Sequence, residues 1–158
     1  MSAPLVWWSQ GEDETESLGE ALGKALLPRG VLLLEGEMGS GKTVLVRGLA
    51  RALGVDAREV QSPTYALIHE HGGDEARLVH VDLYRLAPEE IETLGLDEQM
   101  ASPGIVAIEW ADRLEDLWGP LAGPGILAAE ILRDEDGRRQ ILLRGDLDRL
   151  PKTQTDLS

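Results

Sequence analysis

The sequence predicts an α/β fold whose central sheet is mainly parallel, with additional antiparallel strands joined in hairpins. Three apolar runs, at 31–35, 78–82 and 105–109, each end in an acidic residue, a pattern typical of buried parallel strands. Helical patterns lie between these runs, and turn signals near 72–73 and 134–137 indicate two hairpins. Because strands and helices alternate, helices should cover both faces of the sheet and give three layers.

The expected elements of the first third of the chain follow in order. Residues 4–8 have the pattern of a short strand, and residues 13–27 carry leucine and alanine at helical spacing. Pro28 should end this helix, because proline cannot continue the helical hydrogen bonding. The strand at 31–35 then leads through a glycine-rich loop into a helix expected at 42–53.

The rest of the chain has weaker signals. A hairpin should join strands at 65–71 and 76–83, and a short helix is expected at 88–94. A second hairpin is expected within 126–144. We expect residues 1–150 to form a single domain and residues 151–158 to form a flexible C-terminal tail.

Charge and composition restrict the classes of function. The 158 residues include 15 basic and 29 acidic side chains, a formal net charge of −14. This charge opposes direct binding to DNA, to tRNA or to an anionic membrane surface. The sequence has no cysteine, so it offers no disulfide and no thiolate metal site. No targeting or membrane-spanning segment is visible, so a cytoplasmic protein is expected.

The sharpest functional signal is the segment 36–43, which fits the phosphate-binding P-loop pattern without a mismatch. Its glycines let backbone N–H groups face phosphate oxygens, and the following helix presents the positive end of its dipole to the same anion. Lys42 should reach the β- and γ-phosphates, and the Thr43 hydroxyl should bind Mg²⁺. The segment therefore predicts a P-loop NTPase-like domain. The expected nucleotide contacts here are Glu37, Met38, Gly39, Ser40, Gly41, Lys42 and Thr43.

Two acidic residues complete the predicted site. A P-loop nucleotidase needs a carboxylate at the end of a neighbouring strand, where it holds Mg²⁺ directly or through water. Asp82 and Glu109 both end apolar runs that would carry them to this edge of the sheet. Thr64, in the segment 62–65, could supply a hydroxyl that senses the γ-phosphate. The sequence alone leaves open which acid contacts the metal and which positions the attacking water.

Other polar side chains have simpler interpretations. His69, His71 and His80 alternate on expected strands, and satisfied or solvent-facing histidines are favoured over a metal cluster. Trp110 fits either the core or a cover over the site. Arginines near the second hairpin alternate with acids, which favours a solvated face over an arginine-rich lid. These arginines are Arg133, Arg138, Arg139, Arg144 and Arg149.

Four motifs occur in order along the chain. They are the P-loop at 36–43, Ser-Pro-Thr-Tyr at 62–65, His-Val-Asp-Leu-Tyr-Arg-Leu at 80–86 and Ile-Glu-Trp-Ala-Asp at 108–112. Together they resemble the bacterial family of tRNA threonylcarbamoyladenosine biosynthesis ATPases, the TsaE or YjeE family. The P-loop is shared by many protein families, whereas the second and third motifs in this order are much more specific.

The resemblance implies an activity and partners. Proteins of this family are small P-loop ATPases that support formation of the threonylcarbamoyl group on adenosine 37 (t6A37) of tRNAs reading codons that begin with A. The TsaB–TsaD pair carries out the carbamoyl transfer, and the ATPase binds that pair and uses hydrolysis to reset it between turnovers. By resemblance, the chain would bind ATP or ADP with Mg²⁺, would hydrolyse ATP slowly alone, and would meet tRNA only through the complex.

The resemblance also implies roles for individual residues. Lys42, Asp82 and Glu109 would be catalytic, with Asp82 as the Walker-B-like acid and Thr43 and Glu109 as the Mg²⁺ ligands. Thr15 matches a family position near the adenine. Residues 62–65, with Thr64, would be the switch segment. Positions at the site or its partner surface would be Tyr84, Arg85 and Trp110.

Three other classes of protein compete with this interpretation. A regulatory GTPase is disfavoured, because its guanine-binding motif needs asparagine and the chain has none. A small-molecule P-loop kinase is the main alternative, and it would need an arginine-rich lid and an acceptor pocket. A nucleotide-binding module without activity would need neither Asp82 nor Glu109.

Overall fold

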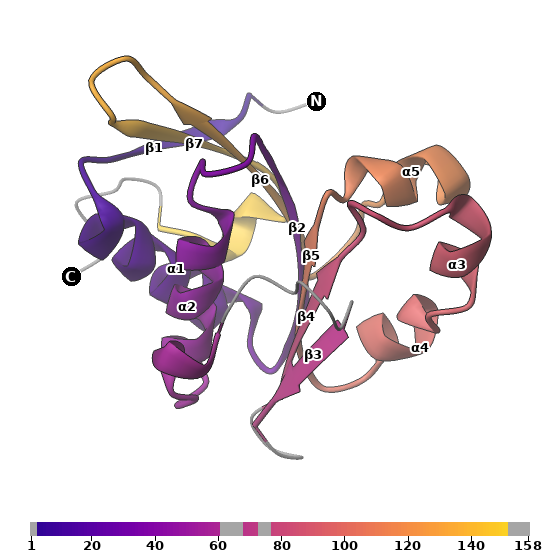
Figure 1. Cartoon of the computed structure of the whole chain (residues 1–158). Helices are drawn as coiled ribbons and strands as arrows, with labels where there is room; N and C mark the ends of the chain where they lie inside the picture. The colour runs from indigo at the N-terminus through magenta and orange to yellow at the C-terminus, as the bar shows by residue number, and fades with distance from the viewer. Residues whose placement is uncertain (1–2, 61–67, 73–76, 152–158) are drawn as a thin grey trace.

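A seven-stranded sheet organises the part of the chain that the computed structural model describes, residues 3–60, 68–72 and 77–151 (Figure 1). The strand order is β1-β7-β6-β2-β5-β4-β3. The parallel centre consists of β6 (Ile126–Arg133), β2 (Arg29–Gly36), β5 (Gly104–Glu109) and β4 (Leu78–Asp82). Antiparallel pairing adds β7 (Arg139–Gly145) and β1 (Leu5–Ser9) at one side and β3 (Ile68–His71) at the other. The predicted mainly parallel sheet with antiparallel hairpin strands is confirmed.

Helices cover both faces of this sheet, which confirms the predicted three layers. Figure 1 shows α1 (Glu12–Leu26) and α2 (Lys42–Ala52) together on one face. The other face carries α3 (Pro88–Glu92), α4 (Leu96–Ala101) and α5 (Asp112–Trp118). Short 3-10 turns, η1 (Ala57–Glu59) and η2 (Leu147–Arg149), follow α2 and β7.

The apolar runs in the sequence reflect burial on both sides of the central strands. Successive side chains of a strand point to opposite faces, so a strand covered on both faces must be apolar throughout. On β2, Leu32 and Leu34 belong to the core beneath α1 and α2. Their neighbours Val31 and Leu33 belong to the core beneath α3, α4 and α5.

Helices α1 and α2 pack backbone against backbone through two glycines. A Cβ atom on Gly48 would lie 2.1 Å from the carbonyl oxygen of Glu16, and one on Gly19 would lie 2.1 Å from that of Leu45. No larger residue fits at either position without moving a helix. Because α2 begins at Lys42, this contact also positions the loop before it.

The structure refines several of the predicted elements. The N-terminal strand, both long helices and the 126–144 hairpin occur within a few residues of their predicted bounds. The strands β3 and β4 pair as predicted, although residues 73–76 of their connection lie outside the described residues. Helices α4 and α5 were not predicted. Positions 152–158 of the predicted tail also lie outside the described residues. Among the described residues, no helix has the length and apolar character needed to cross a membrane.

Candidate functional site

The P-loop connects the end of β2 to the start of α2 and requires glycine at defined positions. Gly36 has a φ of 149°, and a Cβ there would lie 2.7 Å from Ser40 Oγ. Gly41 has a φ of 116°, and a Cβ there would lie 2.9 Å from the Nε atom of Arg139. Both positions combine a positive φ with a close neighbour, so the loop conformation depends on glycine.

Lys42 follows the loop as the first residue of α2 and is largely buried. Its Nζ atom donates a hydrogen bond to the carbonyl oxygen of Gly36 at 2.6 Å. The same Nζ atom lies 3.9 Å from the ring centroid of Trp110, a cation–π contact. Burial lowers the pKa of the Lys42 ammonium, although the negative charges of Glu109 and Asp82 oppose this shift.

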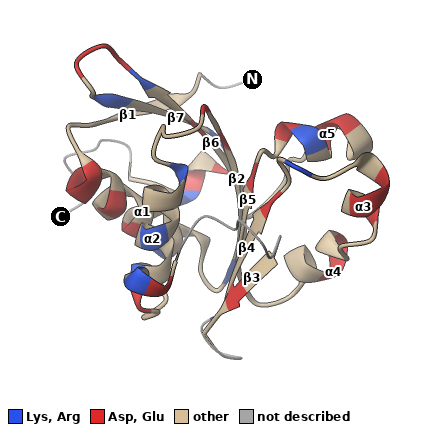
Figure 2. Ribbon diagram, in the orientation of Figure 1, with Lys and Arg blue, Asp and Glu red and all other residues tan. Residues whose placement is uncertain are grey.

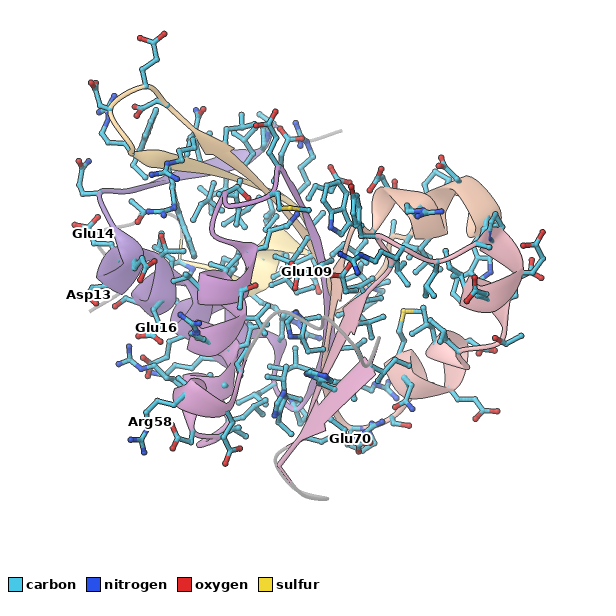
Figure 3. All side chains as sticks on the ribbon, viewed as in Figure 1. Asp13, Glu14, Glu16, Arg58, Glu70 and Glu109 are labelled. Atoms are coloured by element: carbon cyan, nitrogen blue, oxygen red, sulfur yellow. The ribbon has the colours of Figure 1, made fainter. Side chains whose placement is uncertain are left out.

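The two strand-end acids are neighbours in the sheet. Asp82 pairs with Glu109 in the parallel register of β4 and β5, so both carboxylates leave the same edge. Burial raises the pKa of the Asp82 carboxyl, and the negative charge of Glu109 adds to this rise. The backbone N–H of Tyr84 donates to Asp82 Oδ1 at 2.9 Å, and this hydrogen bond opposes the rise. Figure 3 shows Glu109 in the interior, whereas Asp13, Glu14 and Glu16 project from α1.

Glu109 is held by a buried histidine. The fully buried His80 donates from Nε2 to Glu109 Oε2 at 2.5 Å. Within the described residues, Oε1 of Glu109 has no hydrogen-bond partner and is available to a ligand. His80 Nδ1 has no partner in the described part of the chain, so Glu109 is the polar contact that this imidazole makes there.

Trp110 lines the cavity and also packs against the core beneath α3, α4 and α5, so both positions that its sequence context left open apply. Its φ of 61° is unusual for a residue with a side chain and turns the chain sharply after Glu109. The indole lies 4.7 Å from the Tyr84 ring, centroid to centroid. Arg113 supports this arrangement by donating to the carbonyl oxygens of Leu83 at 3.2 Å and Tyr84 at 2.5 Å.

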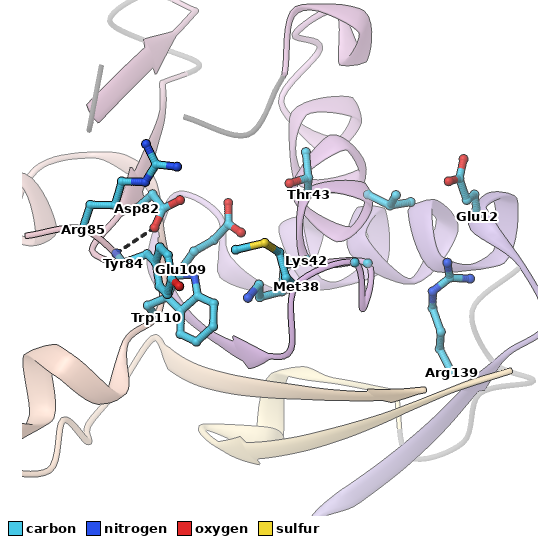
Figure 4. A pocket seen from close by; sticks show the side chains of 13 residues that line it. Glu12, Met38, Lys42, Thr43, Asp82, Tyr84, Arg85, Glu109, Trp110 and Arg139 are labelled. Atoms are coloured by element: carbon cyan, nitrogen blue, oxygen red, sulfur yellow. Dashed lines mark hydrogen bonds between the residues drawn. The ribbon is translucent and has the colours of Figure 1, made fainter. Parts of the chain in front are cut away.

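These groups surround a cavity of about 430 Å³, a size suited to a small ligand (Figure 4). Its lining residues are Glu12, Met38, Gly39, Gly41, Lys42, Thr43, Val44, Asp82, Tyr84, Arg85, Glu109, Trp110 and Arg139.

Most of the predicted site residues lie at this cavity, and a few do not. Met38, Gly39, Gly41, Lys42, Thr43, Asp82 and Glu109 line it, whereas Glu37 and Ser40 are not among its lining residues. Thr15 is buried away from the lining, and its Oγ1 atom lies 2.7 Å from Ser9 Oγ. Thr64 lies outside the described residues. The assigned roles of all these residues remain predictions.

Arg139 corrects one expectation from the sequence. Its alternation with acids favours a solvated position like those of the other hairpin arginines, but only 8% of its surface is exposed. Its Nε atom donates to the carbonyl oxygen of Ser40 at 2.9 Å, so the side chain reaches back to the P-loop. Arg139 is two and four residues before the buried Ile141 and Leu143 on β7, so all three side chains point to the same face of the sheet. This two-residue spacing was the sequence signal that could have predicted the burial of Arg139.

The oxygen groups in the cavity suit a hard divalent cation. Thr43 offers a hydroxyl, and Asp82 and Glu109 offer carboxylates, the donor types that Mg²⁺ prefers. No cluster of three or more acidic, histidine or cysteine side chains able to hold a metal exists among the described residues. Mg²⁺ typically uses one or two protein oxygens together with water and substrate phosphates, and Thr43 with one of the two carboxylates could provide them.

Together, the strand–glycine loop–helix unit, its lysine and the strand-end acids define a P-loop NTPase fold. A family model described as threonylcarbamoyl adenosine biosynthesis protein TsaE matches residues 9–147. The chain belongs to the TsaE family.

Individual relatives support this assignment. The chain is 43% identical over 107 residues to a tRNA threonylcarbamoyladenosine biosynthesis protein TsaE from Nostoc, covering 65% of this chain and 65% of that protein. It is 38% identical over 112 residues to the TsaE of Bacillus subtilis, covering 71% of this chain and 70% of that protein. The crystal structure of Bacillus subtilis YdiB matches with a TM-score of 0.70 at 30% identity, covering 99% of this chain and 95% of that one.

Proposed function

We propose that this chain is a Mg²⁺-dependent ATPase of tRNA threonylcarbamoyladenosine synthesis. It binds the TsaB–TsaD pair in the cytoplasm and uses ATP hydrolysis to reset that pair between turnovers, while tRNA is reached only through the complex. The observation that carries the proposal is the meeting of Lys42, Thr43, Asp82 and Glu109 at one cavity, in a chain of the TsaE family.

Hydrolysis needs charge stabilisation and an aligned water. The backbone N–H groups of the P-loop and the Lys42 ammonium bind the β- and γ-phosphates and stabilise the charge that develops as the bond between them breaks. Thr43 and Glu109 would hold Mg²⁺, which when bound would neutralise part of the phosphate charge. The Asp82 carboxylate orients the water that attacks the γ-phosphorus, and the products are ADP and phosphate.

The arrangement of Lys42 supports the proposal that the isolated chain hydrolyses ATP slowly. Its ammonium is already bonded to Gly36 and packed against Trp110, so it must leave these contacts to reach a phosphate. Docking of the partner pair beside Tyr84 and Trp110 would favour this rearrangement.

The test is threonylcarbamoyl-tRNA synthesis over many turnovers with TsaB and TsaD, with and without this chain. We expect Lys42→Ala and Glu109→Gln to reduce turnover at least about 100-fold, because each removes a group that acts in the transition state. Arg58→Ala is the matched control, since Arg58 is exposed and pairs with Asp56. Multiple turnover that survives both site variants would contradict the proposal.

The alternative function is a small-molecule P-loop kinase. Its test is phosphate transfer from ATP to a small acceptor in the absence of TsaB and TsaD. Such transfer, combined with no effect of the chain on tRNA modification, would favour the kinase over the proposed ATPase.

A further inference from the structure

One buried polar side chain lies behind the cavity rather than in its lining. His80 on β4 is fully buried and is not among the residues that line the cavity. Successive side chains of a strand alternate between faces, so His80 points to the same face of the sheet as Leu78 and Asp82. Leu78 belongs to the apolar core beneath α1 and α2, whereas Asp82 lines the cavity. His80 therefore stands between this core and the cavity.

Packing alone does not account for a histidine at this position. The residue opposite His80 on β5 is Ala107, which belongs to the same apolar core as Leu78. Burying an imidazole costs free energy unless its nitrogen atoms find partners, and an apolar side chain would avoid this cost. Among the described residues, Nδ1 has no partner, and Nε2 donates to Glu109 Oε2 at 2.5 Å. The hydrogen bond to Glu109 is the feature that explains a polar side chain here.

This hydrogen bond fixes one of the two oxygens of the Glu109 carboxylate. His80 holds Oε2 from the side of the core, and Oε1 has no hydrogen-bond partner in the described part of the chain. Glu109 lines the cavity, and in the view of Figure 4 it lies between Asp82 and Thr43. With Oε2 bound from behind, Oε1 is the oxygen left to face a ligand in the cavity.

A second charged group makes the direction of this carboxylate important. Lys42 lines the same cavity, yet its ammonium forms no ion pair with Glu109 within the described residues and instead donates to the carbonyl oxygen of Gly36 at 2.6 Å. A carboxylate without the histidine contact would be free to turn towards this ammonium, because opposite charges attract strongly in a partly buried site. Two directions are therefore open to Glu109, and the contact with His80 selects one.

We propose that His80 is a positioning residue for nucleotide-bound Mg²⁺: by holding Oε2 of Glu109, it directs Oε1 to the cation. The histidine itself contacts neither the cation nor the phosphates. Side chains that orient metal ligands in this way commonly change metal affinity by about 10- to 100-fold when they are lost. This inference rests on the proposed function, in which Glu109 is a ligand of Mg²⁺, and adds a residue that does not line the cavity.

Three substitutions of His80 separate the hydrogen bond from the packing. His80→Leu fills the core with an apolar side chain and removes the donor. His80→Gln keeps a donor, because its amide nitrogen lies as many bonds from Cα as the Nε2 atom of histidine does. His80→Asn carries the same amide on a shorter side chain, which does not reach Oε2.

Binding of Mn²⁺ reports on the metal site without any hydrolysis. Mn²⁺ accepts the same oxygen ligands as Mg²⁺, and its electron paramagnetic resonance spectrum distinguishes the bound ion from the free ion. The full chain, in excess over a non-hydrolysable ATP analogue, is titrated with Mn²⁺. We expect His80→Leu and His80→Asn to weaken Mn²⁺ binding about 10-fold or more, and His80→Gln to weaken it by less than about 3-fold.

Calorimetry with the same analogue and a metal chelator provides the control for folding of the P-loop. Without a divalent cation, the affinity for the nucleotide should change by less than about 3-fold in all three variants, because the phosphates are bound by other residues. His69→Ala replaces the half-buried histidine that lies opposite His80 on β3, and it should leave both measurements unchanged.

A double-mutant cycle tests whether His80 acts through Glu109. Glu109→Gln alone should weaken Mn²⁺ binding about 10-fold or more, because it removes the charge of a metal ligand. In that background, His80→Leu should weaken Mn²⁺ binding further by less than about 3-fold. Two losses that multiply in full would mean that His80 acts by another route, and would overturn the inference.

The remaining outcomes also decide. Equal losses of Mn²⁺ affinity and of metal-free nucleotide affinity in His80→Leu would assign the histidine to the fold alone and overturn the inference, as would a glutamine variant as weak as the leucine variant. If His80→Leu does not fold, the comparison of glutamine with asparagine carries the test. An unmodified chain that did not bind the analogue would contradict the proposed function itself. Binding of the analogue and Mn²⁺ with no loss in Glu109→Gln would leave nucleotide binding intact and overturn this inference.

Discussion

Two ionisable side chains of the cavity, Asp82 and Lys42, lie where their charged forms are disfavoured. Burial raises the pKa of Asp82 and lowers the pKa of Lys42, so each is pushed towards neutrality in the free chain. The shifts mean that ionised Asp82 and Lys42 lower the free energy of unfolding at neutral pH. Polar site residues of this kind commonly trade stability for function.

Asp82→Asn should therefore raise the melting temperature of the free chain and weaken binding of Mg²⁺–ATP. The raised pKa of Asp82 destabilises the fold at pH values above it, and asparagine removes that penalty while keeping an acceptor for the Tyr84 N–H. We expect a gain of about 1–3 °C at pH 7–8.

The pH dependence provides the check on this prediction. As the pH falls through the raised pKa, Asp82 becomes protonated in the folded state and the gain should shrink. It should vanish below about pH 3, where the carboxyl is protonated in both states. Thermal melts of both proteins from about pH 3 to about pH 8 measure this, and a gain independent of pH would contradict it.

His80→Ala should lower stability by about 2–4 kcal/mol, because it leaves a cavity and a buried Glu109 carboxylate without its donor. Urea unfolding measures the change. His69→Ala is the matched control: His69 pairs with His80 across β3 and β4 but is only half-buried, so its loss should cost less than about 1 kcal/mol. Similar losses for the two variants would contradict the role given to His80.

Among the elements, the α1–α2 pair and the β6–β7 hairpin decide how the P-loop is held. The glycine contacts bring α1 against α2, and Arg51 of α2 forms ion pairs with Glu16 at 3.3 Å and Glu20 at 3.2 Å on α1. From the opposite end of the sequence, β7 supplies Arg139 to the loop. The P-loop conformation therefore depends on elements outside its own motif.

Gly48→Ala should destabilise the chain by about 1–3 kcal/mol, the usual cost of overpacking, because its Cβ would meet the Glu16 carbonyl oxygen. It should also weaken ATP binding, since α2 can relieve the contact only by shifting the P-loop. Urea unfolding and calorimetry measure the two effects. Gly11→Ala, where a Cβ would meet nothing within 4 Å, should cost less than about 1 kcal/mol. A loss at Gly48 no larger than this would show that the helices can move apart freely.

Across the whole molecule, acidic charge gathers on particular helices. Figure 2 shows acidic residues at the start of α1 and along α3, α4 and α5, whereas α2 carries basic residues. The −14 net charge is therefore compatible with an anionic ligand, because the P-loop, the helix dipole and Lys42 provide local positive potential. Direct contact with tRNA would have to use a basic minority of the surface.

Glu35→Gln should show how much repulsion between acidic side chains lowers the stability of the fold. Burial raises the pKa of Glu35, and the charges of Glu115, Asp112 and Glu130 add to the rise. Removing the charge should raise the melting temperature at neutral pH in about 10 mM salt, by no more than about 2 °C. Salt screens charge repulsion, so the difference should narrow towards about 0.5 M NaCl. A difference that grows with salt would contradict this explanation.

The predictions from the sequence were strongest where a signal is local. The P-loop is a contiguous motif, and Asp82 and Glu109 follow directly from apolar runs, so the sequence alone is enough to name these residues. Helices α4 and α5 span only six and seven residues, which is too short for a clear periodic signal. The arginines of the second hairpin have similar acidic neighbours in the sequence. The sequence therefore does not show that they differ in how deeply they are buried.

The sequence by itself determined the layered α/β architecture, the phosphate-binding loop and the family, because each produces a local signal, either a hydrophobic periodicity or a contiguous motif. Only the tertiary structure decided which of the remaining polar side chains meet at the cavity. Arg139 lies 99 positions from Ser40, and His80 lies 29 positions from Glu109. Such pairings depend on strand order and helix packing, which no local pattern specifies.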